Sequence, residues 1–235
     1  MSDPIVAADA PAAGAAFDLE SLFRLYDLGG PVVVLLGAMS VAATAIAIAK
    51  LLQFRRARVW SGREADRAVD LYLHGDPAAA LSALRDVETP VGRAVAAAMR
   101  ARASVDRTAA REATETAALA EIEGLRGGLR PLEFIAGVAP LLGLFGTVLG
   151  MIAAFRALEA AGARVDPSIL AGGIWEALFT TAAGLAVAMP ALALSNWFDR
   201  IVDRTAHRIE VLAGRVLTAE AQGAARAAPP AMAAE

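Results

Sequence analysis

The chain has 235 residues, of which 57% are hydrophobic, and a formal net charge of −3. Its mean hydropathy of +0.51 is too high for an ordinary soluble domain, and its nearly balanced charge argues against binding to nucleic acid or acidic ligands. The lack of cysteine excludes disulfides, thiolate metal sites and cysteine catalysis. His74 and His207 are the two histidines and lie far apart in sequence, so neither a metal nor another cofactor is expected.

The N-terminal segment, residues 1–30, is acidic and is expected to lie outside the membrane. Its acidic residues outweigh Arg24, and no basic cluster precedes the apolar stretch, so no cleavable signal peptide is expected. Residues 18–28, DLESLFRLYDL, are predicted to form a short amphipathic helix on the outer membrane surface.

Three segments are long and apolar enough to cross a bilayer, which takes about 20 residues. The first covers residues 31–53 and carries its only charge, Lys50, near its end, where the side chain can reach the headgroups. The second covers residues 131–156 and is uncharged between Phe134 and Phe155.

The third predicted span, residues 168–198, carries one charge, Glu176. It is longer than the bilayer core requires. Its start is therefore expected to form a turn containing Gly172 and Gly173, or else the helix projects beyond the membrane.

Arginines flank all three spans on one side. Arg55, Arg56 and Arg58 follow the first span, Arg126 and Arg130 precede the second, and Arg200, Arg204 and Arg208 follow the third. The positive-inside rule places these flanks in the cytoplasm. The N-terminus and a turn at residues 157–167 are then periplasmic, and the C-terminus is cytoplasmic.

The loop between the first two spans, residues 54–130, is predicted to be cytoplasmic and helical. Asp76 and Thr89 each precede a proline, the arrangement of a capping side chain before the first helical position. Residues 91–123 are rich in alanine, with arginine and glutamate interspersed, which favours one long helix.

Residues 199–235 continue the third span as a cytoplasmic helix that ends in a disordered tail. Ile201, Val202, Ile209 and Leu212 can pack along this helix. The predicted fold is therefore all-α: an integral membrane protein with three transmembrane helices, of which the second and third extend into a cytoplasmic helical domain. No internal repeat is present, which argues against a transporter built from inverted repeats.

The second span contains an unusual number of glycines. Gly143, Gly146 and Gly150 lie within it, and each would cost about 1 kcal/mol relative to alanine in a helix in water. In a bilayer, small residues let helix backbones approach closely. These glycines, with Gly184 in the third span, are therefore predicted to be helix-packing positions.

Glu176 and three threonines of the second and third spans could carry protons. A carboxylate inside a membrane is costly, so Glu176 indicates function, unless it lies at the interface and reaches water. The hydroxyls of Thr147, Thr180 and Thr181 can hold water or pass a hydrogen bond to a carboxylate. Alternatively, each hydroxyl donates to a carbonyl of its own helix.

Pro140 and Pro190 lie inside the second and third spans and each removes one backbone hydrogen bond. Each is predicted to kink its helix, and the bend can shape a central cavity or simply be relieved by neighbouring helices. No phosphate-binding loop, metal-ligand cluster or nucleophile–base set is recognisable, so the chain is not expected to be an enzyme.

Two motifs carry a resemblance to a known family. GLFGTVLGM, preceded by Ala139-Pro140, resembles the second membrane helix of the MotA/TolQ/ExbB proton channel family. The stretch from Glu176 to Pro190, EALFTTAAGLAVAMP, resembles the third helix of that family, in which a glutamate precedes a threonine, a glycine and a proline.

The resemblance implies specific roles and partners. Thr147 and Thr181 match pore-facing threonines and Glu176 matches the membrane glutamate, whereas many relatives have alanine at the position of Thr180. Five subunits are expected to form a ring in the bacterial inner membrane, in contact with its lipids. The ring would enclose a partner of the ExbD or TolR type, whose single membrane helix brings an aspartate that is protonated and deprotonated. A TonB-like protein is a further expected partner.

Within the family, three spans argue against the MotA type, which has four. The long acidic N-terminal segment resembles the ExbB branch more than the TolQ branch. The function expected is that of a proton-channel stator that uses the proton gradient to drive TonB-dependent uptake at the outer membrane. The alternatives are a TolQ-like subunit of the Tol-Pal system and a passive membrane scaffold.

Overall fold

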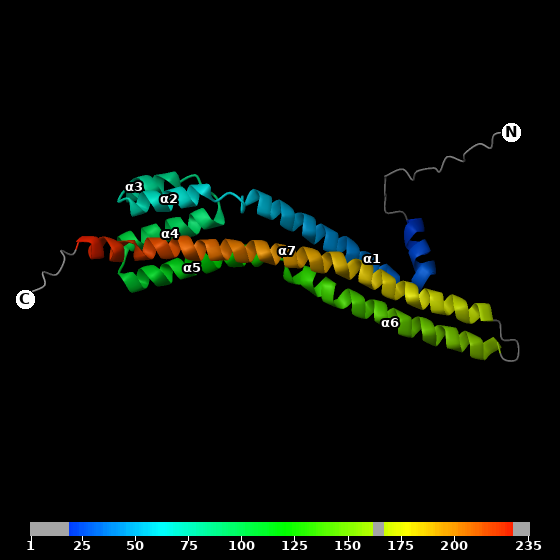
Figure 1. Ribbon diagram of the computed structural model, residues 1–235. Helices are drawn as coiled ribbons and strands as arrows, with labels where there is room; N and C mark the ends of the chain where they lie inside the picture. Colours follow the sequence, from blue (N-terminus) through cyan, green and yellow to red (C-terminus); the bar gives the residue numbers. More distant parts are fainter. Residues whose placement is uncertain (1–18, 162–166, 228–235) are drawn as a thin grey trace, which may run out of the picture. The chain divides into compact units, whose positions relative to one another are not determined.

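The computed structural model describes residues 19–161 and 167–227, and the regular structure within them is entirely α-helical (Figure 1). This confirms the predicted all-α fold. Predictions that concern residues 1–18, 162–166 and 228–235, including the last part of the tail, lie outside the described residues. The chain divides into two compact units, residues 1–39 with 139–187 and residues 40–138 with 188–235.

Within the described residues, three helices are long and apolar enough to cross a membrane, as the sequence predicts. They are α1 (Leu19–Arg56), α6 (Arg130–Ala161) and α7 (Pro167–Ala227). α7 begins at Pro167 and continues through Gly172 and Gly173, so the predicted turn at these glycines does not form. The alternative expectation, a helix longer than the bilayer requires, describes α7 correctly.

α1 is interrupted near its start at Gly30. The φ angle of Gly30 is +63°, a conformation that residues with a Cβ rarely adopt, and Pro31 follows without a backbone N–H. The helical turns before Gly30 therefore leave the direction of the rest of α1 (Figure 1). These turns correspond to the short helix predicted over residues 18–28.

Four shorter helices lie in the second unit: α2 (Arg63–Leu73), α3 (Pro77–Ala83), α4 (Pro90–Ser104) and α5 (Arg107–Arg126). The two predicted caps are confirmed. The Asp76 side chain accepts a hydrogen bond from the Ala79 N–H at 2.9 Å, and the Thr89 hydroxyl accepts one from the Gly92 N–H at 3.1 Å. In both helices proline occupies the first turn, where its missing N–H costs nothing.

The prediction of one long helix over residues 91–123 is wrong. Val105 is extended, and the Asp106 carboxylate accepts a hydrogen bond from the Ala109 N–H at 2.7 Å, which starts α5 as a separate helix. Alanine favours helix on both sides of this break. The break nevertheless forms because Asp106 caps a new helix, and because α5 can then pack against α4 and cover its apolar side chains.

The core of the second unit is built from small and branched side chains of α2, α3, α4 and α7. Ala68, Val69, Ala94 and Val95 are completely buried in it. α7 contributes Ile209, Leu212, Ala213 and Val216. The predicted continuation of the third span as a packed helix is therefore confirmed.

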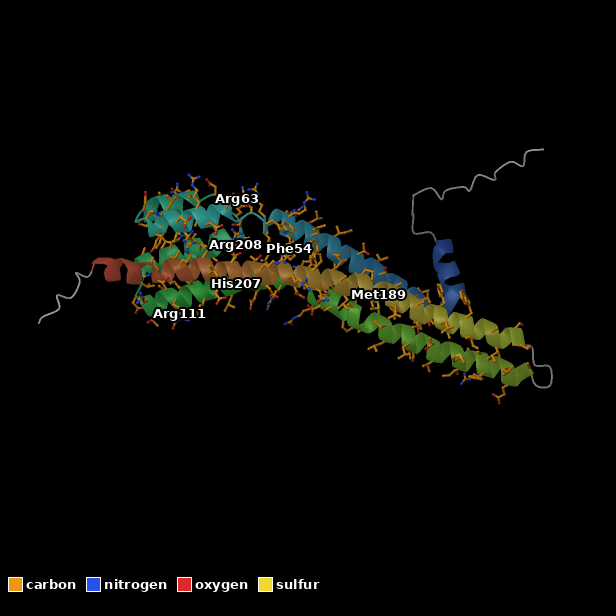
Figure 2. The ribbon with its side chains drawn as sticks, in the orientation of Figure 1. Phe54, Arg63, Arg111, Met189, His207 and Arg208 are labelled. Carbon is orange, nitrogen blue, oxygen red and sulfur yellow. The ribbon has the colours of Figure 1, made fainter. Side chains whose placement is uncertain are left out.

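Ion pairs reinforce the contact between α7 and α2. Arg208 points toward α2, where it pairs with Asp66 (Figure 2). Arg215 lies two turns further along α7 and pairs with Asp70 at 2.9 Å. Because these side chains are partly exposed, each pair contributes at most about 1 kcal/mol.

Lys50 does not reach outward as expected. It is 3% exposed, and its ammonium donates hydrogen bonds of 2.8 Å to the Leu125 carbonyl and to the Gln53 side chain. The sequence gives no indication of this partner, because Leu125 lies 75 residues away.

Candidate functional site

α6 and α7 pack antiparallel in the first unit through small residues that leave no room for larger side chains. A Cβ atom built on Gly184 would lie 2.6 Å from the carbonyl oxygen of Ala139. A Cβ on Gly143 would lie 2.9 Å from the carbonyl oxygen of Thr180. The backbones of the two helices are therefore in direct contact at these glycines.

The contact continues along both helices with a spacing of three or four residues, and we call it the small-residue seam. A Cβ on Gly150 would lie 3.1 Å from Cβ of Ala177, and one on Gly173 would overlap Ala154. The sequence did not identify Ala154, Gly173 and Ala177 as packing positions. Their spacing of small residues four apart was the available signal, but alanine is too common in this chain for that spacing to stand out.

Thr180 is part of this seam. It is 2% exposed, and its hydroxyl donates to the Ala177 carbonyl of its own helix at 2.7 Å. The same oxygen lies 3.3 Å from the Gly143 carbonyl of α6. Thr180 therefore combines back-bonding within α7 with a polar contact across the two helices.

Thr181 and Thr147 are only half-buried. The Thr181 hydroxyl donates to the Gly143 carbonyl at 3.1 Å. Thr147 lies one turn along α6 from Gly143, and its hydroxyl donates to the Leu144 carbonyl at 2.6 Å. The structure thus brings three hydroxyl groups around one turn of α6, two of which retain exposure in the single chain.

Glu176 lies on α7 one helical turn before Thr180 and is exposed in the single chain. Its Oε1 atom lies 3.9 Å from the position that a Cβ on Gly30 would take. The carboxylate is therefore beside the interruption in α1. This position is near the beginning of α7, separated from Thr181 by about 7.5 Å of helix rise.

Pro140 and Pro190 lie in the interior of α6 and α7, and both helices continue past them. Among residues 19–161 and 167–227, no three His, Asp or Glu side chains are grouped so that they could hold a metal ion.

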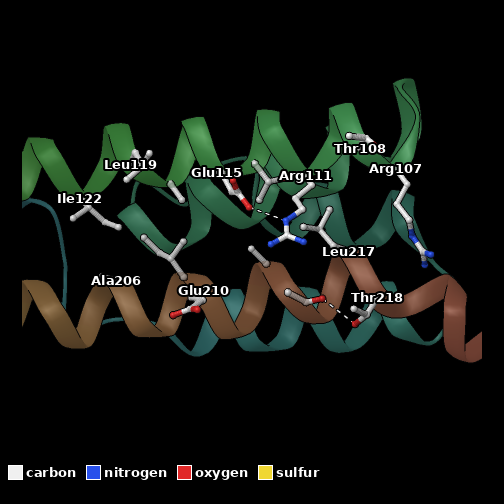
Figure 3. A pocket seen from close by; sticks show the side chains of 15 residues that line it. Arg107, Thr108, Arg111, Glu115, Leu119, Ile122, Ala206, Glu210, Leu217 and Thr218 are labelled. Atoms are coloured by element: carbon white, nitrogen blue, oxygen red, sulfur yellow. Dashed lines mark hydrogen bonds and ion pairs between the residues drawn. The ribbon is translucent and has the colours of Figure 1, made fainter.

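The second unit carries a groove of about 990 Å³ between α5 and α7 (Figure 3). Leu119, Ile122 and Leu217 contribute apolar side chains to it, and Arg111 forms an ion pair with Glu115 at 2.8 Å along α5. The groove belongs to the second unit, whereas the threonines and Glu176 belong to the first.

Comparison with known proteins gives a consistent result. The sequence model described as "MotA/TolQ/ExbB proton channel family" matches residues 86–211. The biopolymer transport protein exbB1 of Vibrio cholerae is 43% identical over 102 residues, a match that covers 40% of this chain and 45% of that protein. A putative biopolymer transport protein ExbB homolog of Methanothermobacter thermautotrophicus is 30% identical over 195 residues, covering 82% of this chain and 68% of that protein.

A second branch is also represented among the relatives. The Tol-Pal system protein TolQ of Haemophilus influenzae is 45% identical over 76 residues, which is 32% of this chain and 33% of that protein.

Proposed function

This chain belongs to the MotA/TolQ/ExbB proton channel family, and we propose from that membership that it is the stator subunit of an inner-membrane motor of the ExbB–ExbD type. In this proposal the motor couples the proton motive force to TonB-dependent uptake at the outer membrane. The observation that carries the proposal is the threonine cluster on a tightly packed helix pair, in which the Thr181 hydroxyl donates to the Gly143 carbonyl of α6 and Thr147 lies one turn along α6.

The cluster supplies only part of a proton pathway. Hydroxyl groups can donate and accept hydrogen bonds, so Thr147 and Thr181 can pass a proton along or hold water, but they do not titrate near neutral pH. Residues 134–155 of the second span carry no charge, and Glu176 is the one carboxylate in residues 167–198 of the third. It lies toward one end of its span, so a second carboxylate must come from another chain.

We assign that missing carboxylate to a single-span partner of the ExbD or TolR type. Its aspartate would be protonated and deprotonated beside Thr147 and Thr181, and the change in its charge would drive movement of the partner relative to the ring. Each charge that crosses the membrane releases about 2.3 kcal/mol per 100 mV. Several protons therefore supply enough energy for mechanical work.

Exposed apolar side chains support both membrane insertion and a ring of subunits. Leu141, Phe145, Leu178 and Met189 are each more than half exposed in the single chain. Such side chains need lipid or neighbouring subunits to cover them. We propose a homo-oligomer, a pentamer by resemblance to the family, whose outer face contacts lipid and whose inner face surrounds the partner.

The orientation that we propose follows from the exposed arginines. Arg55, Arg56, Arg200 and Arg204 are all exposed and follow the apolar stretches of α1 and α7. With these residues in the cytoplasm, the N-terminus is periplasmic and the C-terminus is cytoplasmic.

Proton flux into liposomes that contain the chain and its partner tests this function. Thr147→Val, Thr181→Val and Glu176→Ala should preserve assembly but reduce flux by about tenfold, a change of about 1.4 kcal/mol in the barrier. Thr44→Val is the matched control. Thr44 is an exposed threonine of α1 whose hydroxyl donates to the Ser40 carbonyl of its own helix at 2.9 Å, and its replacement should leave flux unchanged.

Two outcomes would redirect the assignment. If the wild-type complex shows no proton flux with its partner present, the chain is a passive scaffold. If the gene restores a strain that lacks the Tol-Pal stator but not one that lacks the ExbB-type stator, the chain is a TolQ-like subunit.

A further inference from the structure

The junction between α5 and α6 is held by side chains of α1, next to the first residue of α6. A helix leaves its last four carbonyl groups without partners in its own ladder. At the end of α5 the backbone satisfies two of them. The Glu123 carbonyl accepts from the Gly127 N–H at 2.9 Å, and the Arg126 carbonyl accepts from the Leu129 N–H at 3.1 Å.

Side chains of α1 satisfy the other two carbonyls. Lys50 Nζ donates to the Leu125 carbonyl at 2.8 Å, and Gln53 Nε2 donates to the Gly124 carbonyl at 3.0 Å. Lys50 also donates to Gln53 Oε1 at 2.8 Å, so the two side chains are held to each other. A cation at the C-terminus of a helix additionally interacts favourably with the helix dipole.

The connection that follows is short, and we call residues 127–129 the elbow. Gly128 has a φ of +79° there, and a Cβ on it would lie 3.6 Å from Cε of Lys50. Leu129 is 2% exposed, and its carbonyl accepts from the N–H groups of Leu132 and Glu133 in the first turn of α6. The elbow therefore joins the end of α5 to the start of α6 in contact with Lys50.

The same face of α1 also contacts α7. Phe54 lies one turn after Lys50 and packs edge to face on Phe198, with ring centroids 5.6 Å apart. Both rings are almost completely buried. The Lys50 ammonium lies 5.4 Å from the centre of the Phe54 ring, a cation–π contact. All of these groups belong to the second unit.

We propose that Lys50, assisted by Gln53, is a positioning residue that holds the elbow and thereby fixes where α6 begins. Loss of the Lys50 ammonium would leave the buried Leu125 carbonyl without a donor, which is costly away from water. The elbow would then open more often. The effect on proton passage rests on the proposed function, because α6 carries Thr147 about 25 Å beyond its first residue.

Limited trypsin digestion of the full chain in detergent measures opening of the elbow. The Arg126–Gly127 bond is the cleavable bond of the junction, because Arg130 is followed by Pro131. Lys50→Met should accelerate cleavage at this bond by about tenfold or more, and Lys50→Arg, which keeps a cationic donor, should restore a slow rate. Arg55→Met is the control, since it removes an exposed cation from the same helix and should not change the rate.

Gln53→Met provides a milder test if Lys50→Met does not fold. Gln53 is exposed, and its replacement removes one donor, so cleavage should accelerate by about threefold. Equal cleavage rates in wild type, Lys50→Met and Gln53→Met would overturn the positioning role.

Flux measurements on the same variants separate this inference from the proposed function. A lower proton flux in Lys50→Met, together with a normal proton flux in Lys50→Arg, would support the link from the elbow to the pore. Faster cleavage with unchanged flux would overturn that link. A wild-type complex that conducts no protons would contradict the proposed function, while the cleavage rates would still decide the role of Lys50.

Discussion

Gly146 and Thr180 lie so close together that a Cβ atom built on Gly146 would be 2.6 Å from the Thr180 hydroxyl oxygen. Thr180 is buried, and its hydroxyl is already committed to the Ala177 carbonyl. The threonine therefore cannot move away without losing that hydrogen bond. The contact makes Gly146 a position where even one methyl group changes the distance between α6 and α7.

We expect Gly146→Ala to destabilise the pair of α6 and α7 by about 1–3 kcal/mol, the usual cost of overpacking. Gly172→Ala is the control, because a Cβ at Gly172 meets nothing within 4 Å in the described structure. The unfolding free energy of the full chain in mixed detergent micelles measures both effects. If the two variants prove equally stable, the small-residue seam does not set the helix distance.

Replacement of the adjacent threonines should affect stability unequally. Thr180→Val keeps the side-chain volume but removes a buried hydroxyl, and we expect a loss of about 1 kcal/mol. Thr181→Val should cost less, because Thr181 is only half-buried and its hydroxyl donates a hydrogen bond of 3.1 Å to the Gly143 carbonyl. Thermal unfolding in detergent distinguishes the two variants, and a larger loss for Thr181→Val would contradict the described arrangement.

Asp106→Ala tests the break between α4 and α5. The Asp106 carboxylate caps α5 through the Ala109 N–H, so its removal should destabilise the first turn by about 1 kcal/mol. Hydrogen exchange at the amides of Ala109 and Ala110 should accelerate accordingly. Asp86→Ala, at an exposed position after α3, is the control. Unchanged exchange in Asp106→Ala would mean that packing alone defines the start of α5.

Glu64 provides a prediction about pH. Its own backbone N–H and the Ser61 hydroxyl, which donates at 3.1 Å, lower the pKa of Glu64 below its ordinary value of 4.5. A lowered pKa in the folded state stabilises the fold above the unfolded-state value, and this contribution disappears as the pH falls through the folded-state pKa. Ser61→Ala should therefore raise the pKa of Glu64 and narrow the pH range over which the contribution is lost.

Carbon-13 NMR of the labelled glutamate carboxyl groups measures this titration in detergent. Ser82→Ala is the matched control, because the Ser82 hydroxyl donates to the Ala79 carbonyl and not to a carboxylate. An equal pKa of Glu64 in wild type and Ser61→Ala would show that the Ser61 hydroxyl does not contribute to the shift.

Many residues of the candidate site were recognisable in the sequence, but the contacts between α6 and α7 were not. The glycines and threonines of the second and third spans stand out because they interrupt apolar runs. Which face of α7 meets α6 could not be predicted, since a membrane helix is apolar on all sides and has no polar face to orient it. The structure alone shows that Gly143 receives hydroxyl contacts from both Thr180 and Thr181.

The sequence by itself determined the helical class, the three apolar spans and the caps at Asp76 and Thr89, because each depends on neighbouring residues. Only the tertiary structure decided that the alanine-rich stretch turns back at Asp106 and that Lys50 is buried against the end of α5. Alanine favours one continuous helix and two shorter helices that fold back on each other equally well. A lysine's partner 75 residues away is chosen by packing, which no local pattern of residues encodes.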